Sequence, residues 1–427
     1  MRSPRIPMSI LVTAVLVLNP LAQTVPEPSA EGGGLTLAHA KAEALRNNPE
    51  LEAAEAGWRA SQGAARQARS LLNPTLDVSR DDFGGTVPLV ERAPQEAIGV
   101  SQTIRLSGKR KAEVAAADSA STVAREQLRQ AKLDLMATVE KEFAELLGAQ
   151  ERERIAAENL DTAREMSRVV QALVDAGEAS PIEAVRAQNE QDLAAIDGAN
   201  AAQELAAARS RMARTLGRDG KPIGRAEGVL PEEASVPDEA AALASIARLP
   251  DLMRWTAETA RLEASLQRAR REAIPDPTLS FGMRRYTTTR EKAYFAGISI
   301  PLPVFNHNRG GIIEASARLD QGRLEMRAEE LRLRAAVQSA RSALHRSVQE
   351  VDSLRGKILP NAERVYSALN EGYLRGNFRL LDLLEARRSL AVLRLRSVDA
   401  RVRLCVAKAD LDRLVAIEVD LQEGVTP

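Results

Sequence analysis

The chain has 427 residues, of which 44% are hydrophobic, 28% charged and only 3% aromatic. Fifty-nine Lys and Arg residues balance 59 Asp and Glu residues, so a net charge of zero argues against electrostatic capture of nucleic acid. The single cysteine, Cys405, excludes an internal disulfide framework, and three histidines argue against a histidine-based metal site. We expect no metal site, no cofactor and no nucleic-acid partner.

The N-terminus has the pattern of an export signal. Two arginines precede a short apolar run over residues 6–22, and small residues follow it. These features predict a secretory signal peptide over residues 1–30, with cleavage after Ala22 or Ala30. No cysteine lies at or near either cleavage site, so we expect no lipid anchor there. No other segment is apolar enough for a transmembrane helix, so any membrane crossing is expected to use β-strands.

The remaining chain, residues 31–427, reads as one protomer built from a tandem repeat. "GEASPIEAVRAQ" from Gly177 matches "GNFRLLDLLEAR" from Gly376, an offset of 199 residues (376 − 177). "LNPTLDVS" and "PDPTLSFG" match in the same way, and so do "GVSQTIRLSGKR" and "GISIPLPVFNHNRG". Repeat one is assigned to 34–218, a Gly/Pro-rich linker to 219–237 and repeat two to 238–418.

Each repeat is predicted to run helix, strand, strand, long helix, glycine turn, helix. In the strand regions apolar side chains alternate with small or polar ones, as in Leu279, Phe281 and Met283. A soluble sheet with one buried face is the common cause of alternation. Predicted export, and the isolation of four strands among helices, favour a membrane β-barrel instead. Four strands cannot close a barrel, so several copies must pool them; three would give twelve.

The stretch "GISIPLPVFNHNRGG" is predicted to leave the barrel and enter a helix. Pro301 and Pro303 end the strand, because proline cannot donate to the sheet ladder. Long helices are then predicted over 106–175 and 309–375, about 100 Å each at 1.5 Å per residue. Residues spaced by sevens predict a packing seam in the second of them: Val337, Leu344, Val351 and Ile358. Cys405 lies on a similar seam in the last helix, which indicates packing rather than reactivity.

These motifs, in this order and spacing from Leu35 to Glu418, resemble the TolC-type outer-membrane efflux proteins. "LNPTLDVSRDDFGG", "SQTIRLSGKR" and "SIPLPVFNHNRGG" are most similar to outer components of heavy-metal RND efflux systems of the cobalt-zinc-cadmium type. The resemblance implies a mainly α fold with a small β part. It implies a homotrimer whose twelve-stranded outer-membrane β-barrel, four strands per protomer, continues into a long α-helical periplasmic barrel. It also implies a periplasmic adaptor, an inner-membrane RND pump and contact with outer-membrane lipid.

The same resemblance assigns the narrow end of the tube to the glycine turns around Gly177 and Gly376. Glycine permits the left-handed turn and close approach of a partner helical hairpin, so both turns are candidate adaptor-docking sites. An ordinary helix-terminating glycine is an equally good explanation of either residue, and it is compatible with docking.

The resemblance also assigns selectivity and gating to charged residues that follow the two turns, because "LLDLLEA" occupies the place of the constriction aspartates of the TolC family. Asp382 and Glu385 lie three residues apart, so their carboxylates point from one helical face. In a trimer they would form two acidic rings that favour cations. Glu183 and Arg186 are the equivalent residues of repeat one, and Arg186 is a candidate partner that locks the tip closed. The alternative is that these are solvated helix charges.

The sequence shows no paired catalytic constellation, so we expect no enzyme. The resemblance implies a passive exit duct, with divalent heavy-metal cations as the favoured substrate. Two alternatives stay open. The first is an exit duct for drugs or for type I protein secretion. The second, from another class, is a periplasmic coiled-coil scaffold without a barrel.

Overall fold

The structure, a computed structural model, describes residues 34–81, 95–218, 223–287 and 289–415. The predicted signal peptide lies outside these residues. From Leu35 onward the described residues belong to one compact unit. Its elements are α1 (Leu37–Asn47), α2 (Pro49–Ala68), β1 (Thr75–Asp81), β2 (Gln95–Thr103), α3 (Lys109–Asp175), α4 (Pro181–Thr215), α5 (Glu239–Ser245), α6 (Pro250–Glu272), β3 (Thr278–Tyr286), β4 (Lys292–Ser299), α7 (Arg309–Ser353), α8 (Leu359–Leu374) and α9 (Leu380–Val415), with a 3-10 turn at Ile246–Arg248 and a π-helical turn at Leu354–Ile358.

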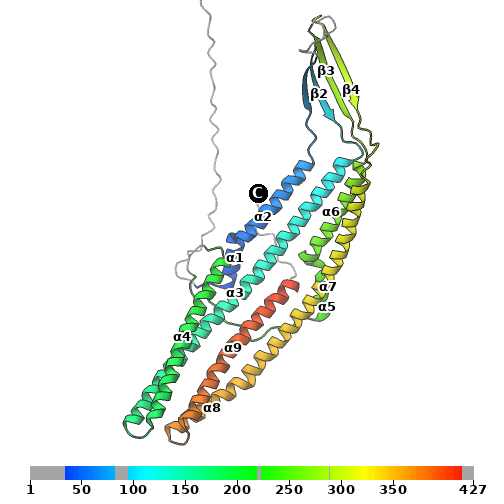
Figure 1. Cartoon of the computed structure of the whole chain (residues 1–427). Coiled ribbons are helices and arrows are strands. Elements are labelled where there is room, and N and C mark those ends of the chain that lie inside the picture. Colours follow the sequence, from blue (N-terminus) through cyan, green and yellow to red (C-terminus); the bar gives the residue numbers. More distant parts are fainter. Residues whose placement is uncertain (1–33, 82–94, 219–222, 288, 416–427) are drawn as a thin grey trace, which may run out of the picture. The chain divides into compact units, whose positions relative to one another are not determined.

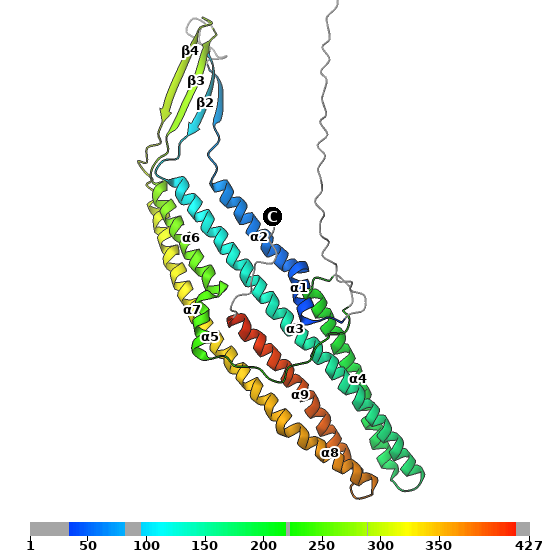
Figure 2. The same cartoon turned by 180° about the vertical axis from the view of Figure 1, so that it is seen from behind.

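The order of elements repeats along the chain. The series α2, β1, β2, α3, α4 is matched by α6, β3, β4, α7 with α8, and α9. In both views of the fold, α3 lies beside α4 and α8 lies beside α9, each pair ending in a turn (Figures 1 and 2). The predicted mainly helical fold, small β part and internal repeat are therefore confirmed.

The two repeats contribute one hairpin each to a single antiparallel sheet in the order β1-β2-β3-β4. They join where β2 pairs with β3, with Val100 opposite Phe281. The outer edges of the sheet are β1 and β4. Every residue of β1 is exposed in the part of the chain that the structure describes.

The two faces of the sheet differ in polarity. One face carries exposed apolar side chains, which are 48 to 84% accessible at the following positions: Leu76, Val78, Ile98, Val100, Phe281, Tyr294 and Ile298. The other face carries mostly small or polar residues, such as Asp77, Gly99 and Ser101. An exposed apolar patch of this kind marks a surface that meets another protein or lipid.

The strands end as the prolines predict. β4 ends at Ser299, and Pro301 and Pro303 follow it. The side chain of Asn308, which has a left-handed φ of 55°, donates to the carbonyl of Ala269 at the end of α6 (2.7 Å) and helps start α7. Ile104 and Leu106 continue the apolar alternation of β2, and from that alternation alone they would be expected in the strand, but they lie beyond its end at Thr103.

The 67-residue helix α3 is the central element of the described chain, since it contacts α1, α2, α4, α6 and α9. It contains no proline, and many of its buried residues are alanines, which permit close helix packing. Together with α1, α4 and the linker it forms the largest core, which includes Phe143, Leu146 and Met212. None of the helices in the described ranges is both long and apolar enough to cross a membrane.

The second long helix, which was predicted to be continuous over residues 309–375, is interrupted between α7 and α8. Residues Leu354–Ile358 form a π-helical turn immediately before Pro360. Proline lacks an N–H and its ring clashes with the carbonyl four residues earlier, and a wider turn relieves that clash. The extra residue rotates the helix, so Val351 and Leu354 are buried but Ile358 is 39% exposed. The assignment of Ile358 to the packing seam was therefore wrong, while Val337 and Leu344 are confirmed as buried.

An ion-pair network ties the end of α9 to both repeats. The guanidinium of Arg413 donates to Asp251 of α6 (2.8 and 2.9 Å) and to Asp134 of α3 (2.6 Å). Asp251 is 6% exposed, and Gln130 of α3 donates a further hydrogen bond to it (3.1 Å). Because the charges of Arg413 and Asp251 are largely buried, each depends on the other, and the network fixes α9 between α3 and α6.

Candidate aperture at the two hairpin turns

The turn after α3 and the turn after α8 have the same backbone geometry. Gly177 has a φ of 78° and Gly376 a φ of 76°. In the first turn the N–H of Glu178 donates to the carbonyl of Leu173 (2.8 Å), and in the second that of Asn377 donates to Gly372 (2.8 Å). This is the Schellman motif, in which a left-handed residue ends the helix. The two turns assigned from the sequence are therefore equivalent in three dimensions.

The space around both glycines is open. A Cβ atom added to Gly177 or Gly376 would meet no heavy atom of the chain within 4 Å. Within one chain, the positive φ alone accounts for glycine at these positions. Both turns are accordingly available for contact with another molecule.

The helices that leave the turns begin with different caps. In α4 the hydroxyl of Ser180 accepts from the N–H of Ile182 (3.4 Å), and Pro181 occupies the first helical position. In α9 the carboxylate of Asp382 accepts from the N–H of Arg379 (3.3 Å), as an acid at the third helical position does in a capping box. Asp382 therefore stabilises the helix start as well as carrying charge.

An apolar cluster beneath the turns packs the two hairpins against each other. Leu383, which is fully buried, lies with residues from α3, α4 and α8. The buried members of the cluster are Met166, Val170, Ala187, Leu380, Leu383 and Leu384. Because this cluster fixes the start of α9 against α3 and α4, it sets the positions of the charged residues on the first two turns of α4 and α9.

The four charged candidates lie close to the glycine turns, Glu183 and Asp382 on the first helical turn of α4 and α9 and Arg186 and Glu385 on the second. Asp382, Glu385 and Arg186 are exposed, and Glu183 is half-buried. Within the described chain no ion pair joins these four residues to one another. The structure of one chain therefore leaves Glu385 and Arg186 facing outward with their charges available to a neighbour.

The contacts that do join the hairpins were not foreseen from the sequence. Arg388 of α9 forms an ion pair with Glu190 of α4, and Arg387 of α9 donates to the backbone carbonyl of Asn159 in α3. Burial lowers the pKa of Arg387 below its ordinary value. Burial also raises the pKa of Tyr373, and the negative charge of Glu183 adds to that rise. The only sequence signal for these links was a pair of arginines one turn beyond Glu385.

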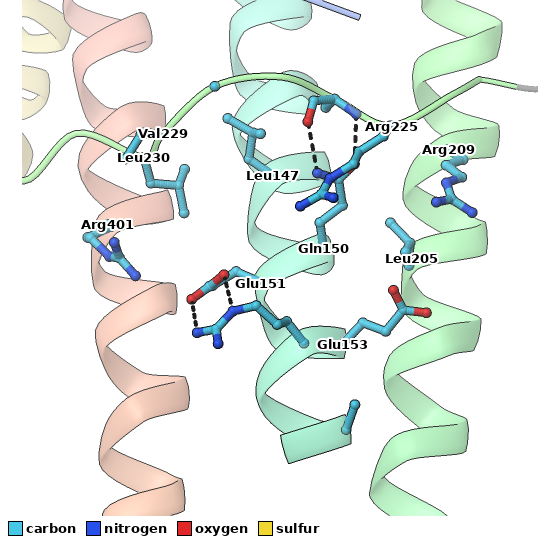
Figure 3. A pocket seen from close by; sticks show the side chains of 14 residues that line it. Leu147, Gln150, Glu151, Glu153, Leu205, Arg209, Arg225, Val229, Leu230 and Arg401 are labelled. Carbon is cyan, nitrogen blue, oxygen red and sulfur yellow. Dashed lines mark hydrogen bonds and ion pairs between the residues drawn. The ribbon is translucent and has the colours of Figure 1, made fainter. Parts of the chain in front are cut away.

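A second candidate is a cavity of about 670 Å³ beneath the linker, between α3, α4 and α9 (Figure 3). Gln150 of α3 holds the linker through two hydrogen bonds with the backbone of Ala226 (2.8 and 3.1 Å). Arg154 pairs with Glu151 and with Glu158 on the same helix. The hydrogen bonds of Gln150 therefore hold the linker against α3. Among the described residues, no group of three or more His, Cys, Asp or Glu side chains is placed to hold a metal ion.

A tandem helical repeat with one shared sheet and two glycine turns is the architecture of outer-membrane efflux channels. A family model described as "Outer membrane efflux protein" matches residues 41–218 and 244–416. The chain belongs to this family, which confirms the resemblance to TolC-type proteins and places the protein in the outer membrane as an efflux component.

Particular relatives indicate where in the family it falls. The chain is 29% identical to the cobalt-zinc-cadmium resistance protein CzcC of Cupriavidus metallidurans, over 91% of each chain. It is 28% identical to the nickel and cobalt resistance protein CnrC of the same organism, over 75% of this chain and 76% of that one. The pyoverdine export outer membrane protein OpmQ of Pseudomonas aeruginosa is 27% identical, over 86% and 81% respectively.

The solved structure of CusC has the same fold. Its TM-score is 0.77 with 18% sequence identity, covering 89% of this chain and 91% of CusC. Because so few residues are identical, this likeness bears on the fold and not on the cargo.

Proposed function

We propose that the protein is the outer-membrane duct of a tripartite efflux system that exports divalent heavy-metal cations. The observation that carries this proposal is the match to CzcC, a cobalt-zinc-cadmium resistance protein, over 91% of both chains. A second relative, CnrC, is named for nickel and cobalt resistance. The exposed acids Asp382 and Glu385 are consistent with cation passage.

The working form is proposed to be a homotrimer. Among the described residues, the outermost strands of the sheet are β1 and β4, and one face of the sheet carries exposed apolar side chains. Open edges in lipid leave backbone groups without hydrogen bonds, so pooling the four strands of three copies into one closed barrel removes the cost. The apolar face then meets outer-membrane lipid, and the polar face lines the duct.

The partners are proposed to be a periplasmic adaptor and an inner-membrane RND pump, which supplies the energy. The open space around Gly177 and Gly376 supports docking of adaptor hairpins at these turns. In the trimer, Asp382 and Glu385 of α9 and Glu183 and Arg186 of α4 would meet those of neighbouring protomers, where Arg186 is a candidate partner of the acids.

A second candidate is a duct for organic solutes. The similarity to OpmQ, named for pyoverdine export, favours it. A duct for organic solutes would differ from a metal-cation duct in its cargo and not in its fold. A duct for secreted proteins is part of this second candidate.

A deletion strain distinguishes these candidates. The strain is challenged with zinc, cobalt, cadmium and copper salts, and separately with lipophilic drugs, with and without the gene restored. We expect lost resistance to one or more divalent metals, which restoration of the gene recovers. Sensitivity to drugs alone would support the second candidate.

A further inference from the structure

The polar face of the sheet carries one large apolar side chain in its middle, Phe295 of β4. Its direct cross-strand partner on β3 is Gly282, and the partner of Gly282 on β2 is Gly99. The next residue in this row is Asp77 on β1. An aromatic ring on the face proposed to line a water-filled duct calls for a physical explanation, since such a face tolerates small or polar residues.

The ring of Phe295 lies along the sheet, across its two glycine partners. A Cβ atom added to Gly282 would lie 2.4 Å from the ring tip, Cζ, of Phe295. A Cβ atom added to Gly99, two strands away from Phe295, would lie 3.2 Å from the same atom and 3.1 Å from the backbone oxygen of Phe281. The ring therefore reaches over β3 to the edge of β2, and it occupies the space that two side chains would otherwise fill.

A cation lies over the same ring. The guanidinium carbon of Arg284 is 5.7 Å from the ring centroid of Phe295. Arg284 and Phe295 are both half-buried, although they lie on the polar face of a single sheet. A guanidinium stacked on an aromatic ring gains a cation–π attraction, so Arg284 opposes movement of the ring away from the strands.

We propose that Gly99 and Gly282 form a trough that keeps the Phe295 ring flat against the wall, and that this trough sets the width of the duct at the level of the sheet. The inference rests on the proposed trimeric duct with its polar face inward. Three rings that stood upright would project into a space enclosed by only twelve strands. Gly99 and Gly282 are thus positioning residues that act through Phe295.

A purely structural role makes a different prediction. If the ring merely covers the glycines to stabilise the sheet, as aromatic residues often do for glycine in strands, then changes at Gly99 alter stability and leave the conductance of assembled trimers unchanged. If the trough sets the width, a side chain at Gly99 displaces the ring and lowers the conductance of trimers that have assembled. Conductance per channel is therefore the decisive quantity.

The test is a mutant cycle measured as single-channel conductance in planar bilayers, using purified full-length trimers. The variants are Gly99→Val, Phe295→Ala, and both together. Gly99→Val is expected to lower conductance, because the new side chain meets the ring tip and lifts it. Phe295→Ala alone is expected to change conductance little, because a flat ring occupies little of the opening. The double variant is expected to regain most of the lost conductance. Gly297→Ala serves as the matched control, since its Cβ would meet only the movable hydroxyl of Ser280 at 2.9 Å.

Each outcome has one meaning. A loss on Gly99→Val that Phe295→Ala restores supports the trough. Equal conductance in wild type and Gly99→Val, or an equal loss in Gly99→Val and the double variant, overturns it. A large increase on Phe295→Ala alone also overturns it, because the ring would then already stand in the opening. If Gly99→Val fails to assemble, Gly99→Ala, which crowds the ring less, takes its place in the cycle. Wild-type trimers that form no channel at all would contradict the proposed duct instead.

Discussion

The molecule has two pairs of matching glycines, and each pair is required for a different reason. One pair lies at equivalent hairpin turns of the two repeats, and the other pair lies side by side on adjacent strands of the sheet. Gly177 and Gly376 have positive φ angles and open space around them. Gly99 and Gly282 do not have positive φ angles, but the ring of Phe295 fills the space beside them. The turns therefore require glycine for its left-handed backbone conformation, whereas the sheet requires glycine because a larger side chain would collide with the ring of Phe295. Substitutions should separate the two requirements.

The largest effect is expected in the sheet. In Gly282→Ala the added Cβ would lie 2.6 Å from the carbonyl oxygen of Ile98 as well as against Phe295, so the backbone itself must move. Overpacking of this kind costs about 1–3 kcal/mol. We expect a marked loss of heat-modifiable trimer in the outer-membrane fraction, measured by electrophoresis with and without heating. Gly297→Ala is the control, and equal trimer yields from both variants would contradict the account.

A smaller effect on stability, but a large one on efflux, is expected at the turns. Valine at Gly376 costs roughly 1–2 kcal/mol because a β-branched residue resists the left-handed conformation. Asparagine adopts that conformation more readily, yet it still adds a side chain to the open space. If the adaptor docks here, Gly376→Asn and Gly376→Val should both lower metal resistance while trimers persist. Full resistance in both variants would place docking elsewhere, and a loss in Gly376→Val alone would indicate backbone strain.

A still smaller effect on stability is expected when either of the two aperture acids, Asp382 and Glu385, is replaced by alanine. Asp382→Ala removes both a charge and the acceptor for the N–H of Arg379, whereas Glu385→Ala removes only a charge. An acid in the first helical turn contributes about 0.3–1 kcal/mol. We expect Asp382→Ala to lower the melting temperature slightly and Glu385→Ala to leave it unchanged. Asp382→Asn keeps an acceptor without the charge, so it should fall between them. Equal melting temperatures for Asp382→Ala and Glu385→Ala would show that the cap contributes nothing.

The smallest effect is expected at Cys405. Burial raises its pKa to about 11, so only about 0.1% of the thiol is ionised at pH 8. We expect slow reaction with a thiol reagent in the folded protein, fast reaction after unfolding, and an unchanged metal resistance in Cys405→Ala. Rapid labelling of the folded protein would contradict its role as a packing residue.

Much of the fold was predictable because its causes are local. The tandem repeat, the alternation in the strands, and the prolines after Ser299 are properties of neighbouring residues. The π-helical turn was missed because it depends on how the helix relieves the clash of Pro360, which periodicity alone cannot show. Ile358 was therefore assigned to the wrong face.

In the candidate site, too, some features could be predicted from local sequence and others could not. The equivalence of Gly177 and Gly376 followed from the repeat, since both end a helix. The contacts of Arg387 and Arg388 with α3 and α4 were not predictable, because they join residues about 200 positions apart. The placement of Phe295 over Gly99 likewise depends on the register of three strands, which the sequence pattern did not specify.

The central claim is that the proposed trimer is a cation duct whose ion selectivity is set by the acids after the second turn, Asp382 and Glu385. The most direct measurement is the cation-to-anion selectivity of purified trimers in planar bilayers, for wild type and for the variant with both Asp382→Ala and Glu385→Ala. Fixed charge acts over about 8 Å at physiological salt, a distance comparable with a narrow pore. We predict a cation preference with block by added divalent cations in wild type, and a loss of both in the double variant. Arg186→Ala tests the proposed lock in the same assay and should raise conductance. Selectivity, conductance and block that are the same in all three proteins would contradict the account.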